Sequence, residues 1–261
     1  MSLKNIGRIG DNYDEWVVAL RHAKNLLEQA GIKYWIDMGT VLGALRNNDL
    51  ILWDNDIDFS VEISEAPKVF ALVPEFIKAG YQVIATDSEI YFNKPNHISV
   101  GVAFYRSTQD KMWILWLTDY GKWPQLTRHI KRVRERILYR GYHSGLHPLE
   151  EQLYKFFPKA WLVPIRRALV QICLGSGHKA YPMVFPKTMM QEMDAIRLCG
   201  MDFPAPRPVA EYVRMIYGPN WQTPDTKWGW DQVVAIDKTF FNQKDLVDFH
   251  LLKYLDGRKN Y

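Results

Sequence analysis

Three aspartates at alternate positions, Asp54, Asp56 and Asp58, lie near the end of the segment DMGTVLGALRNNDLILWDNDIDF at residues 37–59. In an extended strand, alternate side chains project from one face, so Asp56 and Asp58 can reach one divalent cation, or two close ones, from the same side. Carboxylates packed this densely repel one another unless a cation lies between them. Mg²⁺ prefers oxygen ligands, water and phosphate, and Mn²⁺ accepts the same set. The spacing predicts a metal site at Asp56 and Asp58, with Asp54 in support; a solvated, Asp-rich turn is the alternative.

Gly39 and Thr40 precede these aspartates and open a short predicted helix. Backbone N–H groups at a helix N-terminus bind phosphate oxygens, and Arg46 can add a bidentate contact. A phosphate cradle followed by a metal-holding Asp-x-Asp strand is typical of phosphoryl or nucleotidyl transfer, in which the metal neutralises the diphosphate. For Arg46, a place on the protein surface is the alternative.

The composition indicates one large or two small globular domains, because the 261 residues are 48% hydrophobic and rich in aromatic side chains. Cys173 and Cys199 lack metal-ligand spacing, which favours free thiols in a reducing compartment. The N-terminal residues contain no apolar signal-peptide core, and no apolar run is long enough to span a membrane. We therefore expect a cytoplasmic protein.

Positive charge is concentrated in residues 121–167, which hold eleven Lys and Arg against three Glu, although the whole chain carries only +4. Such a block indicates either a solvated helix face or a surface for an anionic partner. None of the aromatic stacking motifs of RNA-binding modules accompanies it in the sequence, so we expect no nucleic-acid partner.

Hydrophobic periodicity predicts an α+β protein. The first half opens with an amphipathic helix at 14–30, and the strand at 56–63 alternates strictly between apolar and polar residues. The other elements expected there are a strand at 32–37, a short helical turn at 39–46, a helix at 66–80 divided at Pro74, and strands at 81–86, 89–94, 97–105 and 111–118.

Beyond Gly121 the sequence becomes helical and basic. Helices are expected at 126–141, 149–175 and 209–218, with an extended, proline-rich connector at 203–208. We therefore divide the chain into a catalytic core at residues 1–122 and a mostly helical C-terminal subdomain at residues 123–261 that completes the active site.

The segments YWIDMGTVLGALR (34–46) and LILWDNDIDFSV (50–61) resemble the LicD/fukutin-related family of nucleotidyltransferase-fold phosphotransferases. They are similar to its pattern of a strand ending in an acid, a Gly-Thr turn running to an arginine, and a Trp-Asp-x-Asp segment. A second, supporting similarity lies at 184–221, where Phe-Pro, a proline-punctuated connector and a Tyr-Gly after a helix follow one another. The resemblance implies a nucleotidyltransferase-like mixed sheet flanked by helices.

The resemblance also implies an activity, a cofactor and partners. The reaction would be Mg²⁺-dependent transfer of a substituted phosphate, of the phosphocholine or alditol phosphate type, from a CDP-activated donor to a sugar hydroxyl of a glycan or lipid-linked glycan precursor. Such a transferase belongs to polysaccharide biosynthesis. Carried onto this sequence, the metal ligands are Asp56 and Asp58, the contacts to the donor's phosphates are Gly39, Thr40 and Arg46, and the supporting acids are Asp37 and Asp54.

One position departs from the family pattern. The family's third carboxylate follows a histidine-containing strand, which here reads NHISVGVAFY, with Ser99 or Gly101 where the acid would fall. In nucleotidyltransferase folds this carboxylate binds a second metal or takes the acceptor's proton. His97, Asp119 or the substrate is left to fill that role, and His97 also fits a structural place in the strand. We predict that Gly101 lies beside the aspartate pair on a neighbouring strand, with Ser99 pointing to the same side.

Two other functions stay open at this point. A nucleotidyltransferase would join the nucleotide itself to a small molecule or a protein, whereas the favoured reaction releases CMP. A degenerate module that binds nucleotide or glycan without catalysis would account for the missing acid.

The segment YKFFPKAWLVPIRRALV at 154–170 mixes aromatic and aliphatic residues with the cations Lys155, Lys159, Arg166 and Arg167. That mixture suits peripheral contact with the inner face of an anionic membrane, where a lipid-linked precursor would lie. Pro158 and Pro164 are expected to divide it into short pieces. The alternative is that its aromatic residues pack the second subdomain against the first.

Overall fold

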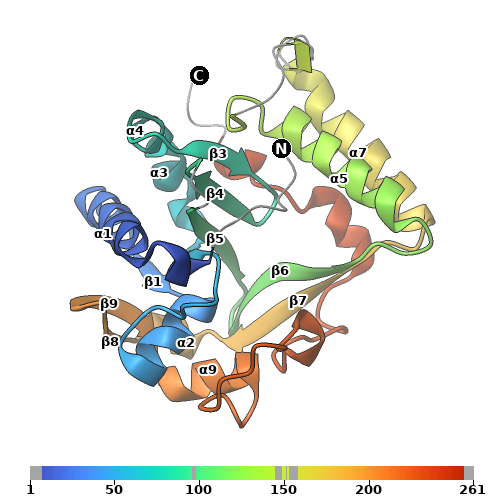
Figure 1. Ribbon diagram of the computed structural model, residues 1–261. Helices are drawn as coiled ribbons and strands as arrows, with labels where there is room; N and C mark the ends of the chain where they lie inside the picture. The colour runs from blue at the N-terminus through green and yellow to red at the C-terminus, as the bar shows by residue number, and fades with distance from the viewer. Residues whose placement is uncertain (1–7, 96–97, 145–148, 151, 153–157, 256–261) are drawn as a thin grey trace.

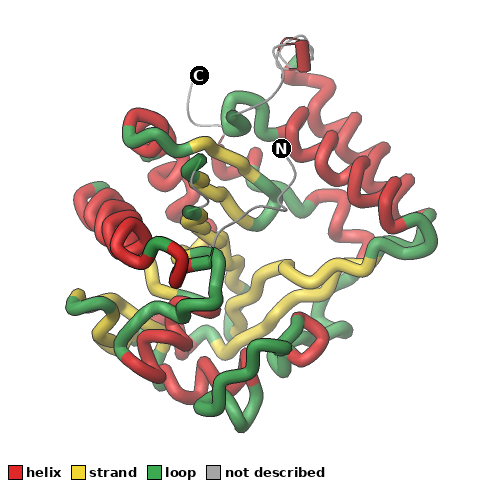
Figure 2. Tube along the Cα trace, viewed as in Figure 1, coloured by secondary structure: helices red, strands yellow, loops and turns green. Residues whose placement is uncertain are grey.

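A mixed sheet of seven strands runs through the part of the chain that the structure describes, and helices lie around it (Figures 1 and 2). The computed structural model describes residues 8–95, 98–144, 149, 150, 152 and 158–255. The strands are β1 (Tyr34–Ile36), β2 (Ile57–Glu62), β3 (Gln82–Ala85), β4 (Glu89–Asn93), β5 (Ser99–Ser107), β6 (Lys111–Asp119), β7 (Lys179–Pro186), β8 (Met193–Leu198) and β9 (Met201–Pro206). The α-helices are α1 (Tyr13–Gln29), α2 (Met38–Asn47), α3 (Ala66–Ala71), α4 (Val73–Lys78), α5 (Pro124–Leu138), α7 (Lys159–Gly175), α8 (Thr188–Gln191), α9 (Val209–Tyr217) and α10 (Leu252–Leu255). Short 3-10 helices lie at Ile9–Asp11, Ile63–Glu65, Trp230–Gln232 and Gln243–Asp248.

The strand order is β1-β2-β5-β4-β3, and β6 pairs with both β5 and β7. Strands β2 and β5 are parallel, with Asp58 opposite Gly101, and the other pairs in the described sheet are antiparallel. Helices flank this sheet, and the helices α5, α7, α8, α9 and α10 follow β6 (Figure 2). The arrangement confirms the predicted α+β class.

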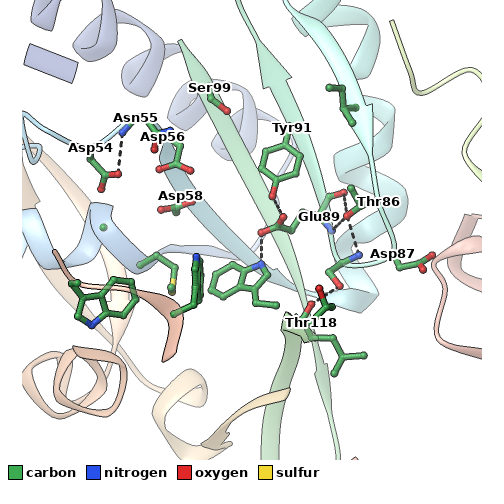
Figure 3. Close-up of a pocket in the computed structure, with 18 of the residues that line it drawn as sticks. Asp54, Asn55, Asp56, Asp58, Thr86, Asp87, Glu89, Tyr91, Ser99 and Thr118 are labelled. Atoms are coloured by element: carbon green, nitrogen blue, oxygen red, sulfur yellow. Dashed lines mark hydrogen bonds between the residues drawn. The ribbon is translucent and has the colours of Figure 1, made fainter. Parts of the chain in front are cut away.

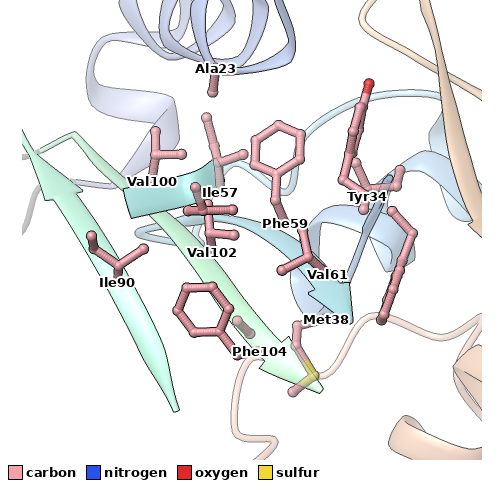
Figure 4. Close-up of a cluster of buried hydrophobic side chains, with 14 of the residues drawn as sticks. Ala23, Tyr34, Met38, Ile57, Phe59, Val61, Ile90, Val100, Val102 and Phe104 are labelled. Atoms are coloured by element: carbon pink, nitrogen blue, oxygen red, sulfur yellow. The ribbon is translucent and has the colours of Figure 1, made fainter. Parts of the chain in front are cut away.

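The strict alternation of β2 gives its two faces different surroundings. Ile57 and Phe59 are fully buried and pack with Val100 of β5 beneath Ala23 of α1 (Figure 4). Burying side chains of this size contributes about 1.5–3 kcal/mol each, which fixes the register of the pair. The same register turns Asp56 and Asp58 to the opposite face, where they line a cavity.

The first helix follows its predicted pattern. Its buried stripe consists of Trp16, Ala19, Leu20, Ala23 and Leu27. The helix stops before Gly31, whose φ of +60° is a left-handed conformation that glycine adopts without strain. Pro74 separates α3 from α4, as predicted, because each short helix takes its proline in the first turn.

The C-terminal part contains three strands that the sequence did not predict. β7 pairs with β6 over most of its length, so the main sheet continues past residue 122. β8 and β9 form a separate hairpin. The expected connector at 203–208 lies largely inside β9, so that prediction is wrong. A two-stranded hairpin leaves each strand one unpaired edge, which is why its prolines, lacking an N–H, are tolerated there.

A buried carboxylate, Asp87, joins the β3–β4 turn to the helical part of the molecule. Its Oδ2 accepts hydrogen bonds from Arg134 of α5 at 2.8 Å and from Arg166 of α7 at 3.1 Å, and its Oδ1 accepts one from Tyr139 at 2.8 Å. Arg166 also donates to the carbonyls of Leu246, Val247 and Phe249. Burial by itself would raise the pKa of Asp87, but the charges of Arg166 and Arg134 and the bond from Tyr139 lower it below its ordinary value.

The expected membrane-contact segment at 154–170 supplies fewer cations than its sequence indicated. Arg166 is buried against Asp87, and Arg167 pairs with Asp248 at 2.9 Å. The helix α7 also continues through Pro164, which does not divide it as expected. Lys155 lies outside the described residues. None of the helices in the described ranges combines the length and the apolar character that a membrane-spanning helix requires.

Replacing Asp87 with Asn is expected to lower the free energy of unfolding by about 3–5 kcal/mol, because it leaves two buried guanidinium groups without their counter-charge. Denaturant titration at pH 7 measures this change. The exposed acid Asp202, which pairs loosely with Arg197 at 3.7 Å, is the matched control, and Asp202→Asn should change stability by less than about 0.5 kcal/mol.

The pH dependence of the free energy of unfolding provides a second test of the role of Asp87. Because folding lowers the pKa of Asp87, its stabilisation is complete above the unfolded value of about 3.9 and is lost as the pH falls below it. The wild type should therefore lose stability below about pH 4 more steeply than Asp87→Asn. Parallel acid-unfolding curves for the two proteins would contradict this role.

Candidate active site

The polar face of the sheet opens into a cavity of about 1400 Å³ (Figure 3). Its walls come from α2, β2, β4, β6, one face of α5 and the segment 217–232. Asp54, Asp56 and Asp58 form an acidic end, with Glu89 farther along the sheet. The α5 face supplies a wall of Lys and Arg side chains. A ligand in this cavity therefore meets both signs of charge.

Backbone contacts between the starts of α2 and β2 aim the aspartates into the cavity. The N–H of Asp58 donates to Oγ1 of Thr40 at 2.8 Å, and the N–H of Asp37 donates to the carbonyl of Asp58 at 3.0 Å. The N–H of Asp54 donates to the carbonyl of Ile51 at 2.9 Å, which closes the turn that precedes the strand. The predicted pair of cavity-facing carboxylates at the start of a strand is therefore present.

The carboxylates at the acidic end repel one another. Burial, and after it the charges of Asp54 and Glu89, raises the pKa of Asp56 to about 8. The pKa of Asp58 also lies well above its ordinary value, because of burial and then the charges of Asp56 and Asp54. A bound divalent cation would reverse this repulsion and favour the ionised carboxylates.

The donor set fits a magnesium ion that keeps part of its shell for substrate. Within the described ranges, no three His, Cys, Asp or Glu side chains are already gathered into a metal cage. Mg²⁺ in phosphate-transfer sites usually binds one or two carboxylates and completes its shell with water and phosphate oxygens. The pair Asp56 and Asp58 matches that requirement.

Gly39 is required by the position of Asp54. A Cβ atom at residue 39 would lie under 3.0 Å from Oδ2 of Asp54, closer than real Cβ contacts come. The Asp54 carboxylate therefore rests against the first turn of α2, where the partial positive charge of the helix N-terminus favours an anion. The Gly-Thr pair thus accommodates one of the supporting acids at the entrance of the site.

Glu89 supplies a further cavity-facing acid, from β4. The hydroxyl of Tyr91 and the indole N–H of Trp116 both donate hydrogen bonds to its carboxylate (Figure 3). Burial raises the pKa of Glu89 to about 7, although the bond from Trp116 and the charge of Lys131 oppose the rise. The position is fixed and titrates near neutral pH, as a proton acceptor requires.

The predicted position of Gly101 beside the aspartates is confirmed. Gly101 pairs with Asp58 on one side and with Tyr91 on the other, and a Cβ at Gly101 would lie 3.7 Å from Oδ1 of Asp58. Ser99 shares its parity and also lines the cavity. Asp119 is exposed at the end of β6, where it accepts a hydrogen bond from the Gly121 N–H at 2.9 Å. The proposed alternative His97 lies outside the described residues.

Asp37 and Thr40 lie beneath the cavity wall and do not line it. The Asp37 carboxylate accepts hydrogen bonds from the Met38 N–H at 2.7 Å, Ser60 at 2.6 Å, Tyr105 at 2.9 Å and Tyr212 at 2.6 Å. Asp37 therefore supports the structure around the site from inside the protein and does not face the cavity. The Thr40 hydroxyl is buried against the Asp58 backbone, a contact different from the donor-phosphate contact that we expected.

Arg46 lines the cavity but grips the protein itself. Its guanidinium donates to the carbonyl of Trp221 and, at 3.1 Å, to that of Thr223. These hydrogen bonds hold the segment 217–232 against α2. Within the same segment, the rings of Trp228 and Trp230 pack against each other, with their centres 5.8 Å apart. To make the expected contact with the donor's phosphates, Arg46 would have to donate to them as well as to these two carbonyls.

Glu89 is the functional candidate that sequence reasoning missed. It is the first residue of a strand that was predicted correctly, and its parity with Tyr91 and Asn93 was readable from the alternation in EIYFN. Which strand would lie beside β5 on that side was not readable. The pairing of Tyr91 with Gly101 decides it.

Comparisons with known proteins place the chain in a family. The family model described as LicD/FKTN/FKRP, nucleotidyltransferase domain, matches residues 31–208. Ribitol 5-phosphate transferase FKRP of Homo sapiens is 40% identical over 45 residues, which are 17% of this chain and 9% of that protein. Ribitol-5-phosphate transferase FKTN of Mus musculus is 25% identical over 116 residues, which are 40% of this chain and 25% of that protein.

Two further similarities complete the comparison. An uncharacterized protein of Rickettsia prowazekii (strain Madrid E) is 34% identical over 64 residues, which are 24% of each chain. The matched segments thus span a quarter or less of these relatives' lengths. A solved structure, lincosamide antibiotic adenylyltransferase LnuA with lincomycin bound, has a TM-score of 0.29 and 17% identity over 37% of this chain and 60% of that chain, which is too low to support an inference. Since the family model matches residues 31–208, including the Gly-Thr turn and the aspartate segment, the chain belongs to the LicD/FKTN/FKRP family.

Proposed function

We propose that this protein is a Mg²⁺-dependent transferase that moves a substituted phosphate from a CDP-activated donor to a sugar hydroxyl of a glycan or lipid-linked glycan precursor. The observation that carries the proposal is that Asp56 and Asp58 at β2 and Glu89 on β4 face one cavity from the same side of the sheet, with β5 between the two strands. The cavity is large enough for two substrates. The matched relatives named ribitol 5-phosphate transferases make an alditol phosphate the first cargo to test, with phosphocholine as the second.

The reaction needs one bond to form and one to break. The acceptor hydroxyl oxygen forms a bond to the donor phosphorus that carries the alcohol. The bond from that phosphorus to the bridging oxygen breaks, CMP leaves with the electron pair, and the hydroxyl proton passes to a base. The protein's task is mainly to position the two substrates and to stabilise negative charge.

Each part of the acidic end has a role in this scheme. Asp56 and Asp58 would hold Mg²⁺, with Mn²⁺ as the alternative ion, and the bound ion would neutralise charge on the diphosphate and on the leaving CMP. Asp54, seated against Gly39, keeps the supporting negative charge next to this pair. Arg46 keeps the segment 217–232 in place as a wall of the donor side.

Glu89 is placed to take the proton from the acceptor hydroxyl. It lies on the same sheet face as Asp58, one strand beyond Gly101, where the family's third acid is absent. Tyr91 and Trp116 donate to its carboxylate and hold its orientation. The missing acid on β5 is thus compensated from β4.

The activity is tested by incubating the protein with Mg²⁺ and a panel of CDP-alcohols, including CDP-ribitol and CDP-choline, and measuring CMP. Slow CMP release without acceptor is expected, because water can replace the sugar hydroxyl. A product that retains the nucleotide would instead identify a nucleotidyltransferase. Binding of CDP-alcohols without any turnover across the panel would indicate the non-catalytic alternative.

Asp56→Asn and Asp58→Asn should each reduce turnover at least about 10³-fold and abolish Mn²⁺ binding measured by electron paramagnetic resonance. Their thermal stability should equal or exceed that of the wild type, because each change removes a repelling charge. Asp119→Asn is the control and should leave turnover unchanged. Wild-type turnover in Asp58→Asn would refute the metal role.

Glu89→Gln is expected to reduce kcat by about 10²–10⁴-fold while Mn²⁺ affinity stays within threefold, because a general base contributes about that much and does not hold the ion. A pH–rate profile separates this role from a structural one: the rise in kcat near pH 7 should be present in the wild type and absent in the variant. Loss of Mn²⁺ binding in Glu89→Gln would reassign the residue to the metal.

Gly39→Ala tests the seat of Asp54. Alanine is a better helix former than glycine by about 1 kcal/mol, so the fold should be kept, but the new Cβ displaces the Asp54 carboxylate. Mn²⁺ affinity should fall by about tenfold. Gly101→Ala is the matched control, since its Cβ makes ordinary contacts of 3.6 Å and 3.7 Å. Equal affinities in both variants would show that the position of Asp54 does not matter.

A further inference from the structure

The basic wall of the cavity is one face of α5, and the proposed chemistry at the acidic end does not use it. Arg128, Lys131 and Arg132 all line the cavity, and their spacing of three and four residues places them on one side of the helix. The helix lies against α7 on its other side (Figure 1). This wall accounts for part of the positive charge that the sequence concentrates in residues 121–167.

The rotation of α5 is fixed by buried contacts. Thr127 is buried, with its hydroxyl 3.1 Å from that of Ser176, and Arg134 is buried against Asp87 at 2.8 Å. These contacts fix the rotation of α5, and in this rotation Arg128 and Arg132 are exposed and line the cavity. The wall is therefore a built feature of the fold.

Part of the positive charge of the wall has no acidic partner among the described residues. Lys131 pairs with Glu135 at 3.3 Å, and the guanidinium of Arg128 lies over the ring of Tyr120, 5.3 Å from its centre. Within the described ranges, neither Arg128 nor Arg132 forms a salt bridge with a carboxylate. Two guanidinium groups thus face the cavity with hydrogen-bond donors to spare.

The wall and the donor side lie at different ends of the cavity. Asp87, two residues before Glu89, pairs with Arg134 of α5, and Glu89 lies between Asp58 and Asp87 in Figure 3, so the wall adjoins the proposed base. The aspartates adjoin Gly39 of α2, and Arg46 of the same helix clasps the segment 217–232. Glu89 therefore separates the metal pair from the basic wall.

We propose that Arg128 and Arg132 bind a phosphate group carried by the acceptor next to its reacting sugar. This inference rests on the proposed function, because it takes the donor's diphosphate to lie at Asp56 and Asp58. An attacking oxygen approaches phosphorus from the side opposite the leaving oxygen, so the acceptor enters past Glu89, along α5. The planar guanidinium fork matches phosphate oxygens in a bidentate geometry, which lysine does not offer.

The test measures anion binding in the absence of metal. Under this condition the carboxylates at the acidic end repel the added anion, so it does not bind at the donor site. Inorganic pyrophosphate is titrated calorimetrically into the full chain in EDTA. Replacing both arginines, in Arg128→Gln/Arg132→Gln, should weaken binding at least about tenfold. The control Arg197→Gln/Arg214→Gln removes the same charge from exposed pairs outside the cavity lining and should leave the affinity unchanged. No binding to the wild type, or equal losses in both double variants, overturns the proposal.

A second arm separates this inference from the proposed function. Mg²⁺-dependent binding of CDP should be lost in Asp58→Asn and kept in Arg128→Gln/Arg132→Gln. If the arginine variant loses CDP binding as well, the wall serves the donor and the acceptor assignment is wrong. If the wild type never binds CDP with Mg²⁺, the proposed function fails, whatever the pyrophosphate titration gives.

Competition against pyrophosphate distinguishes two sources of the same chemistry. A soluble sugar phosphate, glucose 1-phosphate, represents a phosphorylated glycan, and a detergent-solubilised polyprenyl diphosphate represents a lipid carrier. Competition by either compound that disappears in the double variant supports the proposal and names the source. Competition by neither overturns it.

Discussion

The other parts of the site depend on the hydrogen bonds that the buried carboxylate of Asp37 accepts. It accepts hydrogen bonds from the backbone at the start of α2, from Ser60 of β2, from Tyr105 of β5 and from Tyr212 of α9. Burial raises its pKa, and these bonds oppose the rise by stabilising the charged form. A buried acid with several donors is costly to leave incomplete, so the four elements must assemble together. That assembly places the Gly-Thr turn, the aspartate strand β2 and the helix α9 around one cavity.

The cavity combines an acidic region at the aspartates with a basic region on α5. The acidic end gathers carboxylates whose mutual repulsion and burial raise their pKa values. The α5 wall gathers Arg128, Lys131 and Arg132, of which only Lys131 pairs with an acid, Glu135, in the described part of the chain. Neither arrangement stabilises the isolated protein, and a buried ion-pair network around Asp87 holds the two regions in position. Charges kept in unfavourable surroundings are a feature of functional sites.

The proposed base, Glu89 of β4, lies on the strand next to the β5 position where the family pattern led us to expect an acid. Gly101 occupies the β5 position next to Asp58, and the cavity there is filled by the ring of Tyr91 from β4. Tyr91 in turn donates to Glu89, two residues earlier on the same face of the strand. The glycine on β5 and the carboxylate on β4 are therefore linked through one aromatic side chain.

The sequence by itself determined the α+β class, the aspartate strand, the Gly-Thr helix start and the family, because alternation, small residues and charge spacing are local properties. It also predicted that Gly101 would lie beside the aspartates. Only the tertiary structure decided that Glu89 joins them, that Arg46 grips the Trp221 carbonyl, and that β7 extends the main sheet. Those features depend on pairings between residues far apart in the chain, and the proline-rich sequences of β7 and β9 conceal the alternation that would have shown them. Distant pairing is set by the packing of the whole core, which no local pattern encodes.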